Sequence, residues 1–174
     1  MDLRKVTIET ERLLLVPISR KYSEQVLAEY REPVTKYMNH GPPDSIEDVD
    51  GQMEQREIDM KNGTMLFMIA LEKQSDEFLG CFVLEDLDQK NPEMGGWIKK
   101  SAHGNGFGRE AAAGLKQWAD SNLEYDYILW PCAVMNISSR KVAESLGGTA
   151  SKEYEKKTAS GKIWPYVEYR IPKK

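Results

Sequence analysis

Cysteine and histidine are scarce in this chain, whose 174 residues contain two of each. Cys81 and Cys132 form no CxxC pattern and are too few for a disulfide framework, so we expect two buried thiols within apolar runs. His40 and His103 are too few for a histidine-rich metal site, and no metal is expected.

An excess of positive charge and long apolar runs are also missing. The formal net charge is -4, which gives no electrostatic footprint for nucleic acid and is compatible with a cationic substrate. No apolar run approaches the roughly 20 residues that span a bilayer. Residues 1–5 also lack the apolar region of a signal peptide. We therefore expect a cytoplasmic protein that binds neither membrane nor nucleic acid.

The composition is that of an ordinary globular protein, with 40% hydrophobic and 30% charged residues. We expect one domain over residues 1–174. The expected strands are 12–17, 65–71, 78–84, 95–98, 127–134, 149–157 and 163–171, and the expected helices are 22–30, 45–61, 107–122 and 138–146. This order predicts an α/β (α+β) fold, with a mixed central sheet of about six to seven strands and about four helices on both faces.

The expected strand at 127–134 is mainly apolar, which predicts burial on both faces. It also contains Pro131, whose nitrogen cannot donate to a ladder, so this strand should lose its neighbour on one side. The last two strands flank Ala159-Ser160-Gly161-Lys162, a turn that predicts a hairpin.

The strongest chemical signal is the turn His103-Gly104-Asn105-Gly106-Phe107-Gly108, between an expected strand and an expected helix. Glycine permits positive φ and removes the side chain that would block a ligand. The helix start adds unpaired N–H groups, so the turn predicts a pyrophosphate site, with Arg109 beside it and Lys99 and Lys100 just upstream. The spacing GxGxG matches neither the dinucleotide-binding nor the Walker motif. The alternative is that the glycines only permit a sharp turn.

Four blocks along the chain resemble the GNAT N-acetyltransferase superfamily. The glycine turn resembles the Gln/Arg-x-x-Gly-x-Gly/Ala pattern that holds the pyrophosphate of coenzyme A, although His103 replaces the usual Gln or Arg and could equally be a surface residue. Residues 10–17 and 93–98 resemble the opening and fourth strands of the RimJ/RimL-like group, which acetylates the N-termini of ribosomal proteins. Residues 136–147 resemble the NxxS helix of that group.

The resemblance implies an N-acetyltransferase that moves the acetyl group of acetyl-CoA to a primary amine, on a protein N-terminus or a small molecule. Acetyl-CoA is then the co-substrate, an amine acceptor is the other partner, and a homodimer is compatible with the family. The alternative is a non-catalytic acyl-CoA-binding sensor or interaction module. The candidates for coenzyme binding are Trp97, Ile98, Lys99, His103, Gly104, Asn105, Gly106, Phe107, Gly108, Arg109, Asn136, Ser139 and Lys141.

The candidates for catalysis are Glu93 and Ser139. The resemblance places a backbone oxyanion donor near Trp97 or Ile98. Glu93, just before that strand, is the expected base for the amine proton, and the alternative is a solvated strand-end carboxylate. Glu85 and Asp86 are reserve candidates, near the end of the preceding strand.

On the NxxS helix, the resemblance assigns pantetheine contacts to Asn136 and Ser139, and Ser139 or water would protonate the leaving thiolate. Asn136 could instead be a plain helix cap. Many relatives place a Tyr general acid seven residues after this Asn, where this chain has Ala143. Arg140 and Lys141 are candidates for the 3′-phosphate of the coenzyme, although exposed basic residues on a helix are usually just solvated.

Four aromatic residues gather in the expected C-terminal hairpin, namely Tyr154, Trp164, Tyr166 and Tyr169. Aromatic residues in strands usually form core or cross-strand pairs. In the family this hairpin borders the acceptor cleft, so one or two of them are expected to influence which amine is accepted. The sequence does not identify that amine.

Overall fold

The computed structural model describes residues 1–38, 40–158 and 161–174. Within these residues one mixed sheet forms, in the order β1-β2-β3-β4-β5-β6-β8-β7. Its eight strands are β1 (Ile8–Glu9), β2 (Leu13–Pro17), β3 (Leu66–Glu72), β4 (Phe78–Glu85), β5 (Glu93–Ile98), β6 (Tyr127–Ala133), β7 (Thr149–Lys157) and β8 (Ile163–Pro172). The predicted mixed sheet is confirmed.

The described part of the sheet has eight strands, where the sequence predicts about six to seven. The additional strand, β1, has only two residues and pairs with β2 through Ile8 and Leu15. A two-residue strand is too short to show an alternating pattern of burial, so only its pairing partner defines it.

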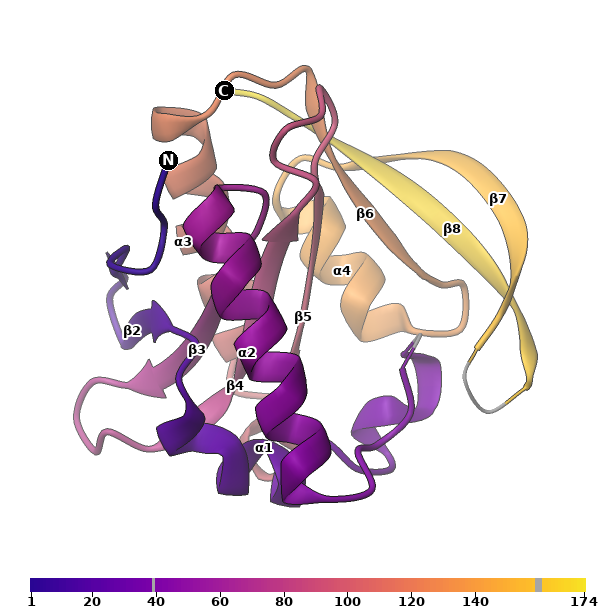
Figure 1. Ribbon diagram of the computed structural model, residues 1–174. Coiled ribbons are helices and arrows are strands. Elements are labelled where there is room, and N and C mark those ends of the chain that lie inside the picture. The colour runs from indigo at the N-terminus through magenta and orange to yellow at the C-terminus, as the bar shows by residue number, and fades with distance from the viewer. Residues whose placement is uncertain (39, 159–160) are drawn as a thin grey trace.

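The four described α-helices cover both faces of the sheet, as predicted. They are α1 (Ser23–Glu29), α2 (Ile46–Asn62), α3 (Phe107–Asn122) and α4 (Ile137–Ser145). Figure 1 shows α2 in front of the sheet and α3 behind it. Next to α1, Tyr30 packs on Trp97 of β5, whereas Gly114 of α3 packs toward Leu15 of β2 on the opposite face.

The ends of α2 follow from its sequence. The side chain of Ser45 accepts a hydrogen bond from the backbone N–H of Asp48 at 3.2 Å and thereby caps the first turn. Gly63, at φ 78°, ends the helix in the left-handed conformation that glycine adopts without a Cβ clash. The predicted capping residue and the predicted stop are both confirmed.

The strands β5 and β6 separate soon after they meet. Their pairing is parallel and limited to Glu93 with Leu129 among the described residues, whereas β6 pairs with β8 along its whole length. Figure 1 shows β6, β8 and β7 curving away from β5. Pro131 lies in the separated part of β6, which confirms the prediction that this strand loses a neighbour. We call the space between these two strands the split.

The prediction that the strand at 127–134 is buried on both faces is wrong. Burial alternates along most of β6, so that Ile128 and Trp130 are buried while Tyr127, Leu129 and Pro131 are partly exposed. The physical reason is that, among the described residues, α1 and α2 pack mainly over β4 and β3 rather than over β6.

The two cysteines are buried and free, as predicted. Burial raises the pKa of the Cys81 thiol to about 12 and that of Cys132 to about 11. The hairpin predicted at the C-terminus is formed by β7 and β8, although Ala159 and Ser160 of its predicted turn lie outside the described residues. None of the described helices is long and apolar enough to cross a membrane.

Candidate functional site

The glycine turn exposes its backbone. Gly104 and Gly106 have φ values of 83° and 80°, which only glycine adopts readily. A Cβ at Gly104 would meet no atom within 4 Å, and one at Gly106 would meet only Nη2 of Arg12 at 3.6 Å. Gly106 is also the N-cap of α3, and no side chain caps this helix. The first N–H groups of α3 are therefore available to an anion, as a pyrophosphate site requires.

Side-chain contacts that the sequence did not predict hold this turn, and we call the residues that make them, Thr10, Arg12 and Glu110, the buttress. Arg12, next to β2, donates from Nη1 to the carbonyl oxygen of Asn105 at 3.0 Å and from Nε to Glu110 at 2.7 Å. Its guanidinium also lies over the Phe107 ring, 4.5 Å from the centroid. Thr10 donates to the same carboxylate at 2.6 Å. Burial alone would raise the pKa of Glu110, but the hydrogen bonds from Thr10 and Arg12 hold it below its usual value.

The other side chains of the turn point back into the protein or outward. His103 donates from Nε2 to the carbonyl oxygen of Ile98 at 2.7 Å. The Asn105 amide donates to the carbonyl oxygens of Ala102 and His103 at 3.3 and 3.4 Å. Arg109 is exposed on the first turn of α3. His103 and Asn105 thus bond to nearby backbone carbonyl groups although both are exposed, and the N–H groups at the start of α3 stay accessible beside Arg109.

The ammonium group of Lys99 is not free for the turn. Lys99 is buried, and its side chain forms an ion pair with Glu77, which lies between β3 and β4. Its backbone N–H donates to the carbonyl oxygen of Leu79 at 2.7 Å. A role for Lys99 in coenzyme binding stays a prediction, and the cation that this residue carries already has a protein partner.

One face of β5 presents a carboxylate, a gap and an aromatic ring. Glu93, Gly95 and Trp97 share this face because side chains alternate along a strand. A Cβ at Gly95 would meet nothing within 4 Å, so the space above it is open. Trp97 is partly buried, with its ring centroid 5.1 Å from that of Tyr30 and 5.8 Å from that of Phe78. This face therefore has room for a small group beside Glu93.

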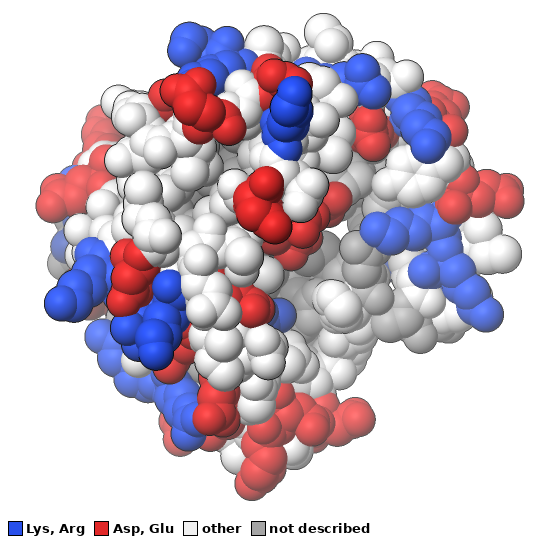
Figure 2. Space-filling model, turned by 45° about the horizontal axis from the view of Figure 1, so that its top comes forward, with Lys and Arg blue, Asp and Glu red and all other residues white. Residues whose placement is uncertain are grey.

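The environment of Glu93 favours its neutral form. Burial is the main cause that raises its pKa to about 7, and Glu85, which lies directly opposite on β4, raises it further. Lys156 of β7 lowers it, whereas Asp86 and Glu168 add to the increase. Figure 2 shows a hollow in the surface with acidic side chains on its margin. A carboxyl group with a pKa near neutrality is suited to take up and release protons.

The backbone of β5 directs N–H groups into the split. Pro92 accepts from Leu129 of β6 at 2.8 Å, whereas Lys99 donates to β4. Backbone groups point to alternate sides along a strand, so even-numbered residues face β6 and odd-numbered residues face β4. Gly96 and Ile98 thus direct their N–H groups into the split, where no strand pairing with β6 is described. The N–H of Trp97 faces β4.

The start of α4 lies on the other wall of the split. Asn136 caps the helix by accepting from the backbone N–H of Ser139 at 3.3 Å. The hydroxyl of Ser139 accepts from the indole N–H of Trp130 at 2.9 Å. Arg140 donates to the Tyr169 hydroxyl at 3.0 Å, which occupies part of its guanidinium. Lys141 is exposed.

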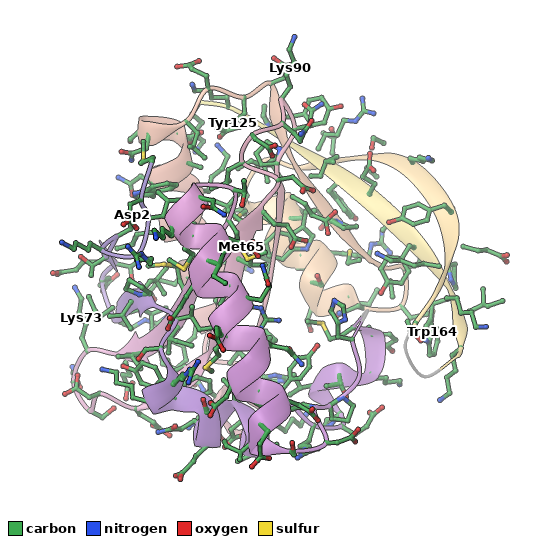
Figure 3. The ribbon with its side chains drawn as sticks, viewed as in Figure 1. Asp2, Met65, Lys73, Lys90, Tyr125 and Trp164 are labelled. Carbon is green, nitrogen blue, oxygen red and sulfur yellow. The ribbon has the colours of Figure 1, made fainter. Side chains whose placement is uncertain are left out.

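Three of the four aromatic residues in the hairpin lie on the face of the sheet that carries Glu93. Tyr166 donates to the carbonyl oxygen of Tyr37 at 2.5 Å and stacks near Tyr154, with 5.9 Å between the ring centroids. Trp164 packs edge-on against Tyr37, and Figure 3 shows it on the hairpin beside that segment. Tyr169 lies on the opposite face, against Arg140.

A family model described as an acetyltransferase (GNAT) domain matches residues 12–149, which is most of the chain. The chain belongs to the GNAT acetyltransferase family. It is therefore an acetyl-CoA-dependent acyltransferase, as the sequence blocks predicted. No curated protein sequence matches the chain.

Solved structures agree on the fold. RimL, a ribosomal L7/L12 α-N-protein acetyltransferase solved with coenzyme A, has a TM-score of 0.85 at 16% identity, covering 96% of this chain and 98% of its own. A GNAT acetyltransferase from Bacillus anthracis has a TM-score of 0.82 at 20% identity, covering 97% and 99%. The microcin C7 self-immunity acetyltransferase MccE, solved with acetyl-CoA and AMP, has a TM-score of 0.82 at 21% identity, covering 94% and 93%. The fold of this GNAT enzyme thus resembles that of RimL.

The buttress gives a first prediction. Replacing Arg12 with Met removes the hydrogen bond to the turn and the ion pair with Glu110, so we expect the Kd for acetyl-CoA to rise about 10-fold, equivalent to about 1.4 kcal/mol. Titration calorimetry measures this change. Arg4→Met removes an exposed ion pair with Asp2 and should leave the Kd unchanged. If the two variants bound acetyl-CoA equally well, the buttress would have no role in binding.

Proposed function

We propose that this enzyme acetylates a primary amine, with the donor in the split and the acceptor on the face that carries Glu93. The observation that supports this most is the position of Glu93. It lies where β5 and β6 part, next to the open space above Gly95, and the glycine turn follows the other end of the same strand. One strand thus connects a phosphate-binding backbone to a carboxyl group with a pKa of about 7.

The donor site consists mainly of backbone. The N–H groups of the turn from Gly104 to Gly108 would hold the pyrophosphate, with Arg109 as the adjacent cation and Lys141 as a candidate for the 3′-phosphate. The N–H groups of Gly96 and Ile98 face the split and are suited to stabilise an oxyanion. Two observations support the fit of acetyl-CoA to this site. The space next to Gly104 and Gly106 is open, and among the described residues β5 pairs with β6 only at Glu93.

Acetyl-CoA supplies an acetyl group activated as a thioester. A bond forms between the amine nitrogen and the acetyl carbon, and Glu93 accepts the amine proton. The bond between carbon and sulfur then breaks with its electron pair on sulfur. Ser139 or water returns a proton to that thiolate, because Ala143 stands where many relatives carry a Tyr acid. Orientation of the two substrates supplies much of the rate.

Two measurements test this function. Acetyl-CoA at about 100 times its Kd should stabilise the fold by about 2.7 kcal/mol, whereas ATP and NAD should not. Thiol release should then follow with at least one member of a panel of peptide N-termini and small amines. A thermal shift without thiol release from any amine would contradict catalysis and support the non-catalytic sensor. If acetyl-CoA gave no shift, the proposed donor site would be wrong.

A further inference from the structure

A guanidinium group that forms no ion pair and no hydrogen bond among the described residues lies on the acceptor side of the sheet. Arg56 of α2 lies over the Phe67 ring of β3, 4.4 Å from the centroid. Among the described residues it forms no ion pair within 4.0 Å and no hydrogen bond. It is only partly exposed, and burial lowers its pKa. A cation partly removed from water without an anionic partner is costly, so a missing anion is the simplest reason for this arrangement.

The acidic group that interacts with Arg56 on this face does not fill that role. Glu85 is close enough to interact electrostatically with Arg56, but burial and Asp86 still raise its pKa above the usual value. A carboxylate tightly paired with Arg would show the opposite shift. Among the described residues, Glu85 therefore interacts with Arg56 without forming an ion pair with it.

We propose that Arg56 binds a carboxylate of the acceptor, which makes the substrate an amine with an anionic group a few bonds from its nitrogen. This inference rests on the proposed acetylation of an amine beside Glu93. Arginine fits a carboxylate with two parallel hydrogen bonds. Free α-amino acids and peptides that begin with an acidic residue both have this chemistry.

The register of the sheet determines how far Arg56 lies from the strand that carries Glu93. Arg56 lies over Phe67, which pairs with Val83 on β4, and Val83 pairs with Gly95 on β5. Two strand spacings of about 4.8 Å place the guanidinium roughly 10 Å from the strand that carries Glu93. A hydrogen bond at each end takes about 3 Å. Glu93 lies two residues further along β5, so the space between the two groups fits a short acceptor that carries an amine at one end and a carboxylate at the other.

The charges around the acceptor space fit the same substrate. Glu93 of β5 and Glu85 of β4 lie where the ammonium group would enter. Arg56 lies over β3, on the other side of the acceptor space. A zwitterionic acceptor would therefore meet a charge of opposite sign at each end. A simple diamine would place a second cation next to Arg56, which is unfavourable.

The test compares wild-type and Arg56→Met enzyme on matched acceptors by thiol release. The pairs are free amino acids with their amides, and tripeptides that begin with Asp with those that begin with Asn. We expect Arg56→Met to lower kcat/KM for the carboxylate member about 10- to 100-fold more than for its amide partner, the range for hydrogen bonds to a charged group. Each acceptor is compared with itself across the variants, so differences in amine basicity cancel. The pair that shows the effect identifies the source of the carboxylate.

Two further variants separate binding from folding. Arg56→Lys keeps the charge but loses the paired geometry and should show an intermediate loss. Arg20→Met removes an exposed arginine paired with Glu54 at 3.0 Å and should keep the wild-type ratio. Equal losses for carboxylate and amide acceptors in Arg56→Met would overturn the carboxylate proposal alone. Absence of thiol release from every acceptor in the wild type would overturn amine acetylation and the carboxylate proposal together.

Discussion

Replacing Gly106 with Val should weaken the binding of acetyl-CoA about 100-fold or more. The residue has φ 80°, where a β-branched side chain is strained by roughly 1–2 kcal/mol. Its side chain would also fill open space at the N-cap of α3, where a Cβ meets only Nη2 of Arg12 at 3.6 Å. Loss of two hydrogen bonds to a charged group costs about 3 kcal/mol, which is about 100-fold in Kd. Titration calorimetry with acetyl-CoA measures the effect.

Gly147 offers a matched control for this substitution. It has φ 86°, no atom lies within 4 Å of a Cβ placed on it, and it follows the C-terminal end of α4. Gly147→Val should therefore lower the melting temperature to a similar extent while the Kd for acetyl-CoA stays at the wild-type value. Unchanged affinity in Gly106→Val, or an equal loss in both variants, would contradict a specific role of the turn.

Replacing Glu93 with Gln should lower kcat about 100- to 10,000-fold, the usual contribution of a positioned general base. The amide keeps the size of the side chain but cannot accept the amine proton. Acetyl-CoA binding should be unchanged, because the glycine turn lies at the other end of β5. Thiol release at saturating acetyl-CoA provides the measurement. A loss below about 3-fold would show that water or another group removes the proton.

The pH dependence of the wild type carries a further signature of Glu93. Its pKa of about 7 reflects burial first, then Glu85, with further increases from Asp86 and Glu168 and an opposing effect of Lys156. The base acts as the carboxylate, so kcat/KM should fall about tenfold per unit as the pH drops below 7. Protonation of an α-amine acceptor, with a pKa of roughly 7.7–8.0, adds a second tenfold decrease in kcat/KM per pH unit. In the Glu93→Gln variant, kcat/KM should keep only the decrease with falling pH that comes from protonation of the amine.

Glu85→Gln is the control for this profile. It removes the negative charge directly opposite Glu93, so the pKa of Glu93 should fall and the acidic limb should move to lower pH. The rate at pH 8 should remain close to that of the wild type. If Glu85→Gln abolished thiol release while Glu93→Gln did not, Glu85 would be the base.

The local elements of the fold could be predicted because their signals are local. The helix expected at 107–122 is α3 itself, and Ser45 and Gly63 bound α2 as expected. Pro131 marked the strand that loses a neighbour, because a missing N–H is a property of one residue. Burial of β6 was predicted wrongly, since coverage of a strand depends on where distant helices pack.

The candidate site was predictable only in part. The glycine turn and Glu93 appear in contiguous blocks, so their residue types could be identified. The contact between Arg12 and Glu110 joins residues 98 positions apart, and neither residue is distinctive alone. Arg56 belongs to a polar helix in which basic residues are usually solvated. Only the packing of α2 on β3 shows that its guanidinium lies over Phe67 without an ion pair among the described residues.

The sequence by itself determined the glycine turn and the order of strands and helices, because conformational freedom at glycine and the periodicity of burial are encoded within a few residues. The tertiary structure decided the rest. It placed Glu93 opposite Glu85 where β5 leaves β6, and it directed the N–H groups of Gly96 and Ile98 into the split. Register and strand divergence are set by contacts between distant segments, and these contacts place Glu93 and the glycine turn toward opposite ends of one strand.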